Sequence, residues 1–407
     1  MTHEPASPIL AGLRVLDLST IVAGPTASMI LADLGADVIK VERPGGGEDG
    51  RAMSPHRGSW GAYFTTLNRG KRSVAIDILK PAGRETVLRI AAGCDVLLEN
   101  FRGGKAAALG LDEASVRCRK PDIIYASLSA YGPCGPDYTR PGYDAILQAR
   151  TGIMSVTGTG TPESGGTPVR AGVSILDMGA GVWMALGVVA ALLERQRSGK
   201  GQRVDSSLFQ TGIMLMSYHL LYRQFSGVNP KPQGSRHTAF APYGAYQASD
   251  GSIMIGISSD KAFRRLAEAL GHPEWAEDAR FRSNPDRVRN TPELDACITE
   301  VLRSRPVAHW TAMLDRHDVA NDAVQNPEQV LNDRQVAALE QLTEIPLAGG
   351  EPVRLPRLPI DLSLNPPAIQ GPPPAVGEHT AAILREAGCT ETEIQELLRS
   401  GVCSQSS

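Results

Sequence analysis

The regular alternation of apolar strand-like segments with helical segments near the amino terminus most restricts the fold of this chain. Residues 13–18 have the composition of a buried strand, and residues 23–25 (Ala-Gly-Pro) form a turn after it. Residues 26–34 follow as a helix that ends at Gly35, and residues 36–42 form the next strand. A strand, helix, strand unit of this kind builds a parallel sheet.

The alternation continues through the first half of the chain. Further strands are predicted at residues 73–77, 95–99 and 122–128, and helices at residues 80–92 and 111–120. We therefore predict an α/β fold with an open, mostly parallel sheet of the Rossmann type.

The residue composition changes after about residue 225, where a linker rich in Pro, Gly and Asn begins. A hairpin whose turn lies at Asp250–Gly251 follows this linker. Amphipathic helices follow, at residues 261–270, 291–303 and 307–316. We predict the following domains: residues 1–200, the amino-terminal part of a large Rossmann-like domain; 201–225, a linker; 226–330, a small α+β domain; and 331–407, a linker and the carboxy-terminal part of the large domain.

Composition narrows the classes of protein to which the chain can belong. A formal charge of −3 with both signs mixed gives no electrostatic argument for nucleic acid or an anionic membrane. The six cysteines form no Cys-x-x-Cys pair, which argues against a zinc site or a disulfide framework and for a reducing compartment. Residues 1–8 do not resemble a secretory signal, and the apolar run 182–193 is short for a bilayer span. We expect a cytoplasmic protein without a bound metal.

Nucleotide-binding motifs are missing from the expected places. The segment after the first strand contains no G-x-G-x-x-G, and the chain contains no G-x-x-x-x-G-K-[ST]. The sequence therefore supports neither a dinucleotide-dependent dehydrogenase nor a P-loop nucleotidase.

Asp177 is the strongest single candidate for a catalytic group. It precedes the apolar helical run 182–193, so its carboxylate lies at the first turn of a helix, near the positive end of the helix dipole. Backbone N–H groups there can hold an anion or an oxyanion. Because Asp is also a preferred helix cap, position alone favours a capping role over catalysis.

Several segments, in order along nearly the whole chain, resemble the class III CoA-transferases, the family of formyl-CoA transferase and carnitine CoA-transferase. The matching segments are residues 13–25, 34–43, 68–73, 95–102, 142–144, 172–177, 242–243 with 250–251, and 377–380. By resemblance, the large domain is formed by both termini, and two ring-like chains interlock as a homodimer.

The resemblance places Asp177 at the family's catalytic aspartate. It implies an acyl-CoA:carboxylate CoA-transferase in which Asp177 attacks an acyl-CoA, with succinyl-CoA as the guessed donor. The reaction then passes through an aspartyl anhydride and an aspartyl-CoA thioester, which is covalent catalysis. The substrates implied are an acyl-CoA and a small carboxylic acid, with coenzyme A as the group carried and no metal or nucleotide cofactor.

Two alternatives remain. The α-methylacyl-CoA racemases resemble this chain, but they carry a His where it has Tyr143, and a tyrosine with a reference pKa of about 10 is a poor proton shuttle at neutral pH. The second alternative is a protein of another class, which binds acyl-CoA without turnover. Exchange of labelled CoA between two acids distinguishes the two classes, because only an enzyme catalyses it.

Arg43, Asn100 and Phe101 match family positions at the CoA site. Arg72 is an additional candidate for a phosphate contact and is equally well explained as a solvated arginine. Lys105 stands where formyl-CoA transferases have Ala, a departure that implies rearranged phosphate contacts.

For the acyl group the first candidate is Tyr143, although packing explains this residue equally well. The second is Val22. Formyl-CoA transferases have Gln at this position, so the valine disfavours formyl or oxalyl substrates. From its loop position His237 is a third candidate, and Arg236 or Arg51 is a candidate to hold the far carboxylate of a dicarboxylic substrate. For each of these residues a hydrogen bond within its loop is the alternative that the sequence favours.

Overall fold

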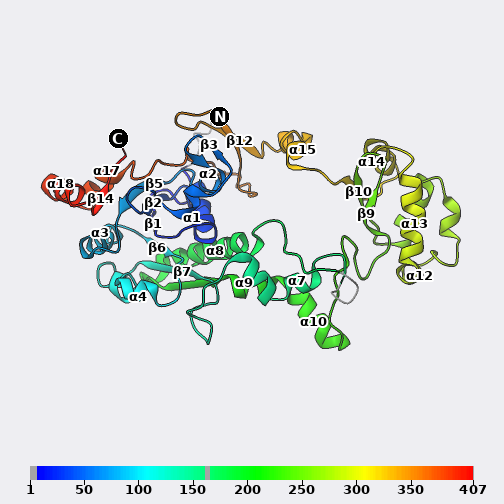
Figure 1. Cartoon of the computed structure of the whole chain (residues 1–407), viewed down its shortest axis with the longest axis horizontal. Coiled ribbons are helices and arrows are strands. Elements are labelled where there is room, and N and C mark those ends of the chain that lie inside the picture. Colours follow the sequence, from blue (N-terminus) through cyan, green and yellow to red (C-terminus); the bar gives the residue numbers. More distant parts are fainter. Residues whose placement is uncertain (1–6, 161–165, 407) are drawn as a thin grey trace. The chain divides into compact units, whose positions relative to one another are not determined.

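The computed structural model describes residues 7–160 and 166–406 (Figure 1). The chain forms two compact units: a large unit of Met1–Gly152, Ala171–Tyr218 and Ala337–Ser407, and a small unit of Ile153–Arg170 and His219–Val336. Residues 201–218, expected in a linker, belong to the large unit instead. The reason is that strand β8 (Arg203–Ser207) pairs with the sheet and helix α9 (Leu208–Leu215) follows it directly.

The large unit is built on a seven-stranded sheet in the order β14-β5-β2-β1-β6-β7-β8. Its neighbours pair in parallel, except that β14 runs antiparallel to β5 and makes the sheet mixed. Continuous apolar runs form the central strands because both faces of the sheet are covered. The strand bounds are β1 Arg14–Asp17, β2 Asp37–Glu42, β5 Arg72–Ile76, β6 Val96–Glu99, β7 Ile124–Ser129, β8 Arg203–Ser207 and β14 Cys403–Ser404.

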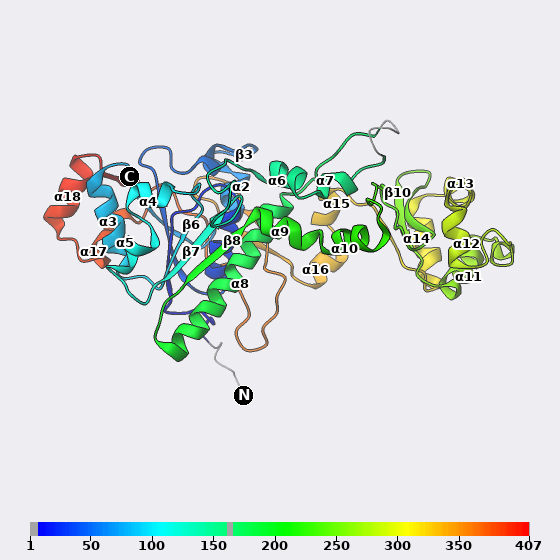
Figure 2. The ribbon, with the colours of Figure 1, turned by 90° about the horizontal axis from the view of Figure 1, so that it is seen from below.

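Helices cover both faces of this sheet. One face packs its apolar side chains, such as Leu16, Val74 and Leu97, against α3, α5, α17 and α18. On the other face α1 and α8 lie alongside each other (Figures 1 and 2). The helix bounds are α1 Ala23–Asp33, α2 Ala62–Leu67, α3 Pro81–Ala91, α4 Lys105–Leu109, α5 Glu113–Arg117, α6 Asp144–Arg150, α8 Ile175–Ser198, α9 Leu208–Leu215, α17 Thr380–Glu386 and α18 Glu391–Arg399.

Helix α1 begins earlier than the sequence predicted, whereas α8 begins as expected, with Asp177 in its first turn. Helix α1 starts at Ala23, so the expected turn Ala-Gly-Pro is its first turn; Pro25 is tolerated there because its missing N–H has no intrahelical partner in any case. Helix α8 starts at Ile175, which places Asp177 within its first turn.

Helix α8 buries one face only, whereas its apolar sequence predicted a largely buried helix. Ala180, Met184 and Val188 are buried, but Val182 and Leu186 on the opposite face are more than half exposed. By length and composition alone α8 would be able to cross a membrane. Of its most apolar stretch of 18 residues, 44% is buried inside the protein.

The small unit has its own core. The predicted hairpin forms from β9 (Tyr243–Gln247) and β10 (Ser252–Gly256), and β11 (Asn321–Ala323) adds the third antiparallel strand. Apolar side chains of the hairpin pack against three helices, which are α11 Asp260–Ala269, α13 Thr291–Leu302 and α14 Val307–Arg316.

Shorter elements complete the chain. They are the hairpins β3 His56–Arg57 with β4 Trp60–Gly61 and β12 Leu342–Ile345 with β13 Val353–Pro356, the 3₁₀ turns η1 Asp49–Ala52 and η3 Pro273–Ala276, and the helices α7 Ile153–Val156, α10 Ser217–Ser226, α12 Asn284–Arg289, α15 Pro327–Leu331 and α16 Arg334–Ala338.

Candidate active site

Asp177 lies in the first turn of α8, in the large unit. Helix α8 leads into β8, which runs parallel to β7, so its amino end lies at the edge where the parallel strands end. Ligand sites of open α/β sheets form at this edge. Burial raises the pKa of Asp177 to about 7, and the negative charge of Asp144 adds to the shift.

A glycine one turn further along α8 fixes what Asp177 lies next to. A Cβ atom on Gly181 would come within 2.6 Å of Thr26 Cβ and 2.7 Å of the Ala23 carbonyl oxygen, so only glycine permits α8 to approach α1 this closely. Residues four apart lie on the same face of a helix. Asp177 therefore shares the face of α8 that meets the amino end of α1.

Asp144, the first residue of α6, holds the start of α8. Its Oδ2 accepts hydrogen bonds from the backbone N–H groups of Leu176 (2.7 Å) and Asp177 (3.1 Å). Its Oδ1 accepts from Gln148 Nε2, and Gln148 Oε1 in turn accepts from the Ala171 N–H at 2.8 Å. Both side chains are buried. A carboxylate remote in sequence thus caps the helix that carries the nucleophile candidate.

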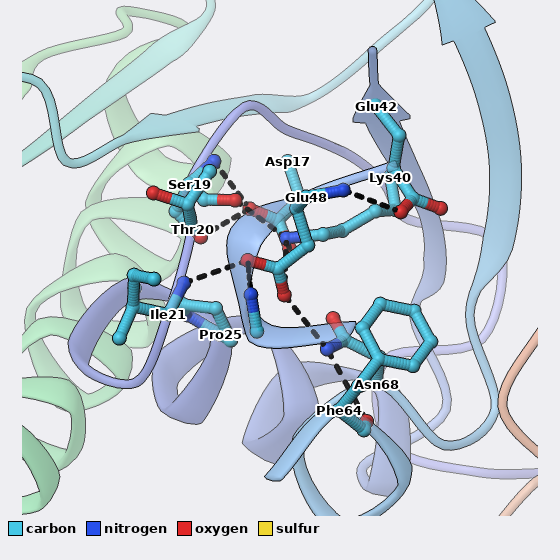
Figure 3. A network of polar contacts seen from close by, with 12 residues as sticks. Asp17, Ser19, Thr20, Ile21, Pro25, Lys40, Glu42, Glu48, Phe64 and Asn68 are labelled. Carbon is cyan, nitrogen blue, oxygen red and sulfur yellow. Dashed lines mark hydrogen bonds and ion pairs between the residues drawn. The ribbon is translucent and has the colours of Figure 1, made fainter. Parts of the chain in front are cut away.

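The turn between β1 and α1 is held through its backbone (Figure 3). Asn100 donates to the Thr20 carbonyl and accepts from the Thr20 N–H, both at 2.9 Å. Glu48 accepts from the Ile21 N–H at 2.8 Å, and Lys40 Nζ donates to the Ser19 carbonyl at 2.5 Å. Ile21 has a φ of +72°, which a β-branched residue rarely adopts. The polar contacts therefore fix a strained turn next to the amino end of α1.

Buried charges lie behind this turn (Figure 3). Lys71 Nζ lies 3.1 Å from Asp17 Oδ2, and Lys40 Nζ lies 3.8 Å from both Asp17 and Glu48. Burial alone would raise the pKa of Asp17, but the two lysine ammonium groups and hydrogen bonds from Ser19 and Ser28 hold it well below its usual range. This compensated cluster, Asp17, Lys40, Glu48 and Lys71, is called the paired cluster below.

A cavity of about 400 Å³ opens at the same edge of the sheet. It lies beyond the ends of β1, β2, β5 and β6 and combines apolar and charged walls. Its lining includes Leu18, Thr20, Arg43, Asp49, Ile78 and Phe101.

The structure brings three of the five predicted CoA residues together at this edge. Arg43 and Phe101 line the cavity, and Asn100 precedes Phe101 and holds the Thr20 backbone. Arg43 also donates to the Gly47 carbonyl at 3.0 Å and pairs with Asp49 at 2.5 Å, so its guanidinium is already oriented.

Arg72 and Lys105 are placed differently. Arg72 is the first residue of β5 and pairs with Asp37, the first residue of β2, and with Glu386. It therefore lies at the edge where the strands begin, whereas Arg43 follows the end of β2 at the opposite edge. Lys105 begins the five-residue helix α4 and is exposed.

The predicted acyl-pocket residues divide between the units. In the large unit, Tyr143 directly precedes Asp144 and is 72% exposed, whereas Val22 is buried against Met29, Leu67 and Leu358. Arg51 makes a two-point contact with Glu42, donates to the Pro374 carbonyl and stacks 3.6 Å from the Phe64 ring centroid, so this guanidinium is fully engaged within the protein.

His237 and Arg236 belong to the small unit. The ring of His237 contacts Phe240 and Tyr243, with centroids 5.1 and 5.5 Å away. Arg236 Nε donates to Asp295 at 2.6 Å, and the side chain is half exposed. It lines a second cavity of about 310 Å³, together with Ser235, Tyr246 and Thr299.

The sequence did not identify the functions of Asp144, Gln148 and Glu48. A usable signal exists for the first two, because an acid at the start of a helix and a Gln four residues later lie on one face. Glu48 lies in a glycine-rich segment that reads as a surface turn. Within residues 7–160 and 166–406, no group of three or more His, Cys, Asp or Glu side chains is arranged to hold a metal ion.

Comparisons with known proteins identify the family of the chain. The model of CoA-transferase family III matches residues 10–380. The human succinyl-CoA:glutarate CoA-transferase is 34% identical over 97% of this chain and 90% of its own length, and the acetyl-CoA:oxalate CoA-transferase of Acetobacter aceti is 35% identical over 94% and 96%.

A solved structure extends the agreement to the fold. The crystal structure of a CAIB/BAIF family protein from Brucella suis has 35% sequence identity and a TM-score of 0.85, covering 94% of this chain and all of that one. A match over nearly the whole length to the family model, to named enzymes and to the fold leads to one conclusion: this chain belongs to CoA-transferase family III and is a CoA-transferase.

Proposed function

We propose that this protein moves CoA from an acyl-CoA donor to a carboxylic acid through covalent intermediates on Asp177. The supporting observation is a carboxylate at the amino end of a helix, partly buried and without an ion-pairing cation among the described residues, at the edge of the sheet that carries the cavity. A carboxylate of this kind is a stronger nucleophile than a solvated one once it is ionised.

The proposed reaction balances without an external co-reactant. A carboxylate oxygen of Asp177 attacks the thioester carbonyl, the C–S bond breaks, and CoA leaves as a thiolate from a mixed anhydride. The thiolate then attacks the aspartyl carbonyl of the anhydride, which releases the donor acid and leaves an aspartyl-CoA thioester. The acceptor carboxylate reverses both steps. Because one thioester replaces another, the reaction needs no ATP.

Each tetrahedral intermediate needs hydrogen-bond donors for its oxyanion. The amino end of α1 lies next to the face of α8 that carries Asp177, and the first N–H groups of a helix have no intrahelical partner. We assign the oxyanion to the N–H groups that follow the Ser19–Ile21 turn, which Asn100 and Glu48 hold in place.

The cavity at the sheet edge suits the nucleotide part of CoA. Its apolar wall of Leu18, Ile78 and Phe101 fits a flat base, and Arg43 provides a charged fork for phosphate. Replacing Arg43 with Ala is expected to raise the KM for the acyl-CoA donor about 10-fold or more with a smaller change in kcat, because a phosphate contact is remote from the reacting carbonyl.

The substrates proposed are succinyl-CoA and a small carboxylic acid, with dicarboxylates as the first acceptors to test. Relatives carry the names succinyl-CoA:glutarate, acetyl-CoA:oxalate and succinyl-CoA:mesaconate CoA-transferase. Both arginines considered for a distal carboxylate are paired within the protein, Arg51 with Glu42 and Arg236 with Asp295. We choose Arg236, because half of its side chain is exposed and it lines a polar cavity of the small unit.

A kinetic comparison tests this assignment. The variant Arg236→Gln should raise the KM of dicarboxylates at least about 10-fold and leave that of monocarboxylates unchanged. Arg280→Gln is the matched control, since Arg280 pairs with Asp278 in the same unit and is exposed. An equal effect on both acid classes would remove Arg236 from the substrate site.

A homodimer is proposed as the working form. The exposed side chains of Met178, Val182, Leu186, Val189 and Leu193 recur every three or four residues and form an apolar stripe along α8. A stripe of this length is unusual on a monomer, and a second copy of the chain would cover it. Light scattering should give a dimer that Leu186→Glu disrupts and Leu364→Glu, at another exposed leucine, does not. A folded wild-type monomer at low concentration would contradict the interlocked arrangement.

The decisive experiment looks for the covalent intermediate itself. Purified protein is incubated with succinyl-CoA and a panel of carboxylic acids, and intact-mass spectrometry is used to search for an adduct that maps to Asp177. An adduct and a new acyl-CoA, both lost in Asp177→Ala, would support the transferase mechanism and name the acceptor. Proton exchange on a 2-methylacyl-CoA without any adduct would favour a racemase, and binding without exchange a non-catalytic acyl-CoA-binding protein.

A further inference from the structure

We propose that Asp144 is a positioning residue that also drives the covalent step. Its hydrogen bonds hold the first turn of α8, and its negative charge disfavours the free Asp177 carboxylate relative to the acylated forms. This inference rests on the proposed function, because it assumes that Asp177 is acylated.

The geometry ties Asp144 to the backbone of the nucleophile. One carboxylate oxygen accepts the N–H groups of Leu176 and Asp177, and the other accepts from Gln148, which in turn holds Ala171. Ser174, at the N-cap position of α8, makes no capping side-chain hydrogen bond. The first turn of α8 therefore depends on Asp144 for its position.

The charges around Asp177 are unbalanced within the described part of the chain. On the elements packed against α8, Asp33 of α1 pairs with Arg69, Arg203 and Asp205 of β8 pair with each other, and α9 carries no charged residue. Arg150 of α6 pairs with Asp137. The charge that acts on Asp177 is that of Asp144, and together with burial it raises the pKa of Asp177.

This imbalance changes in the course of the reaction. When Asp177 attacks the thioester, its negative charge passes to the departing CoA thiolate, and the anhydride and the aspartyl-CoA thioester are both neutral at this side chain. The repulsion between Asp144 and Asp177 therefore exists in the free enzyme and disappears in both covalent forms. Destabilising the free carboxylate shifts the equilibrium toward acylation.

The variant Asp144→Asn separates the charge from the cap. The amide keeps an oxygen acceptor for the N–H groups of α8 and removes the negative charge, while its NH2 group replaces the oxygen that accepts from Gln148. Acylation by succinyl-CoA is followed by intact mass over a pH range, in single turnover. We expect the inflection of the pH–rate profile to fall by about 0.5–1 unit, the adduct at pH 8 to fall about 3- to 10-fold, and the KM for succinyl-CoA to stay unchanged.

Two further variants isolate the cause. Asp144→Glu keeps the charge, so the inflection should return toward the wild-type pH even if the rate is lower. Asp112→Asn is the matched control, because Asp112 caps α5 through the Ser115 N–H, on another helix of the same unit. It should keep the cap of α5 and leave the inflection where it is in the wild type. If Asp144→Asn does not fold, Asp144→Ser supplies a neutral cap for the same comparison.

The outcomes distinguish this inference from the function on which it rests. A wild-type adduct on Asp177 with an Asp144→Asn inflection equal to that of the wild type would overturn the electrostatic role and leave Asp144 as a cap. No adduct in the wild type would instead refute the proposed function, and this inference with it. A lower inflection in Asp144→Asn, restored by Asp144→Glu, would support it.

Discussion

Two acids at the same edge of the sheet, Asp17 fully buried and Asp177 partly buried, have opposite surroundings. Asp17, the last residue of β1, lies 3.1 Å from Lys71 and 3.8 Å from Lys40 and accepts hydrogen bonds from Ser19 and Ser28. Asp177 has another carboxylate, Asp144, as its charged neighbour. The pKa of Asp17 is accordingly held well below its usual range, whereas burial and Asp144 raise that of Asp177 to about 7.

The difference separates structural from functional use of a buried charge. In the paired cluster each carboxylate faces a cation, so the cost of burial is offset and the cluster fixes the turn before α1. At Asp177 the cost is not offset, because its charged neighbour is another carboxylate. The proposed acylation would remove this unfavourable charge. Sites that perform chemistry commonly contain such perturbed groups.

Removing one partner of the paired cluster should have the largest effect on stability. The variant Lys71→Met leaves Asp17 buried with only the more distant Lys40, and we expect a loss of about 3–5 kcal/mol in the free energy of unfolding. Urea denaturation at pH 7 measures the loss. The double variant Asp17→Asn, Lys71→Met should recover part of it, because it removes the uncompensated charge.

Neutralising Asp177 should raise the free energy of unfolding, whereas removing Lys71 lowers it. Its raised pKa means that the unfolded chain ionises first, so stability is lost as pH rises from about 4 to about 7. The shift from 3.8 to about 7 bounds the effect at about 4 kcal/mol, and partial solvent access reduces it. We expect Asp177→Asn to be about 2 kcal/mol more stable than the wild type at pH 8, and the gain to shrink toward pH 4. A variant that is less stable than the wild type at pH 8 would contradict the uncompensated charge.

Glu48 tests the connection between the paired cluster and the turn. Glu48→Gln keeps an acceptor for the Ile21 N–H and removes the charge facing Lys40, so we expect a loss of about 1–2 kcal/mol. Glu48→Ala also removes the contact that Ile21 needs to hold its positive φ, so in this second variant kcat should fall as well, while the KM for the acyl-CoA changes little. A normal kcat together with the stability loss would show that the turn keeps its catalytic conformation without the contact from Glu48.

Local patterns identified most of the fold. Apolar runs gave the parallel strands β1, β2, β5, β6 and β7, and Asp250–Gly251 gave the hairpin of the small unit, because both depend on neighbours in sequence. The parallel strand β8 was missed, because its residues are mostly polar and were expected to form a linker. The position of Asp177 at a helix start was also readable from the sequence, and the comparisons confirm the predicted family. Strand β14 was missed, because a two-residue edge strand from the carboxy terminus has no pattern of its own.

The surroundings of the site were not readable, because they depend on pairs distant in sequence. Asp144 contacts the backbone of Asp177, 33 residues away in the sequence. Arg72 begins β5 and Arg43 follows the end of the parallel strand β2, so the two arginines lie at opposite edges of the sheet. Engagement of Arg51 by Glu42 and Phe64 is likewise visible only in three dimensions. A sequence supplies the kinds of charged groups, and the fold decides which of them are compensated.

An ion pair outside both regions should show the smallest effect. Arg203 and Asp205 lie two residues apart on β8, an edge strand, with side chains 35% and 26% exposed and contacts of 2.8–3.0 Å. Their geometry is as good as that of Lys71 and Asp17, so distance alone would predict a similar contribution. Water already solvates both groups, however, and we expect Asp205→Asn to change the free energy of unfolding by no more than about 0.5 kcal/mol. A loss comparable to that of Lys71→Met would mean that contact geometry, and not burial, determines what these charges contribute, and the contrast between Asp17 and Asp177 would then need another cause.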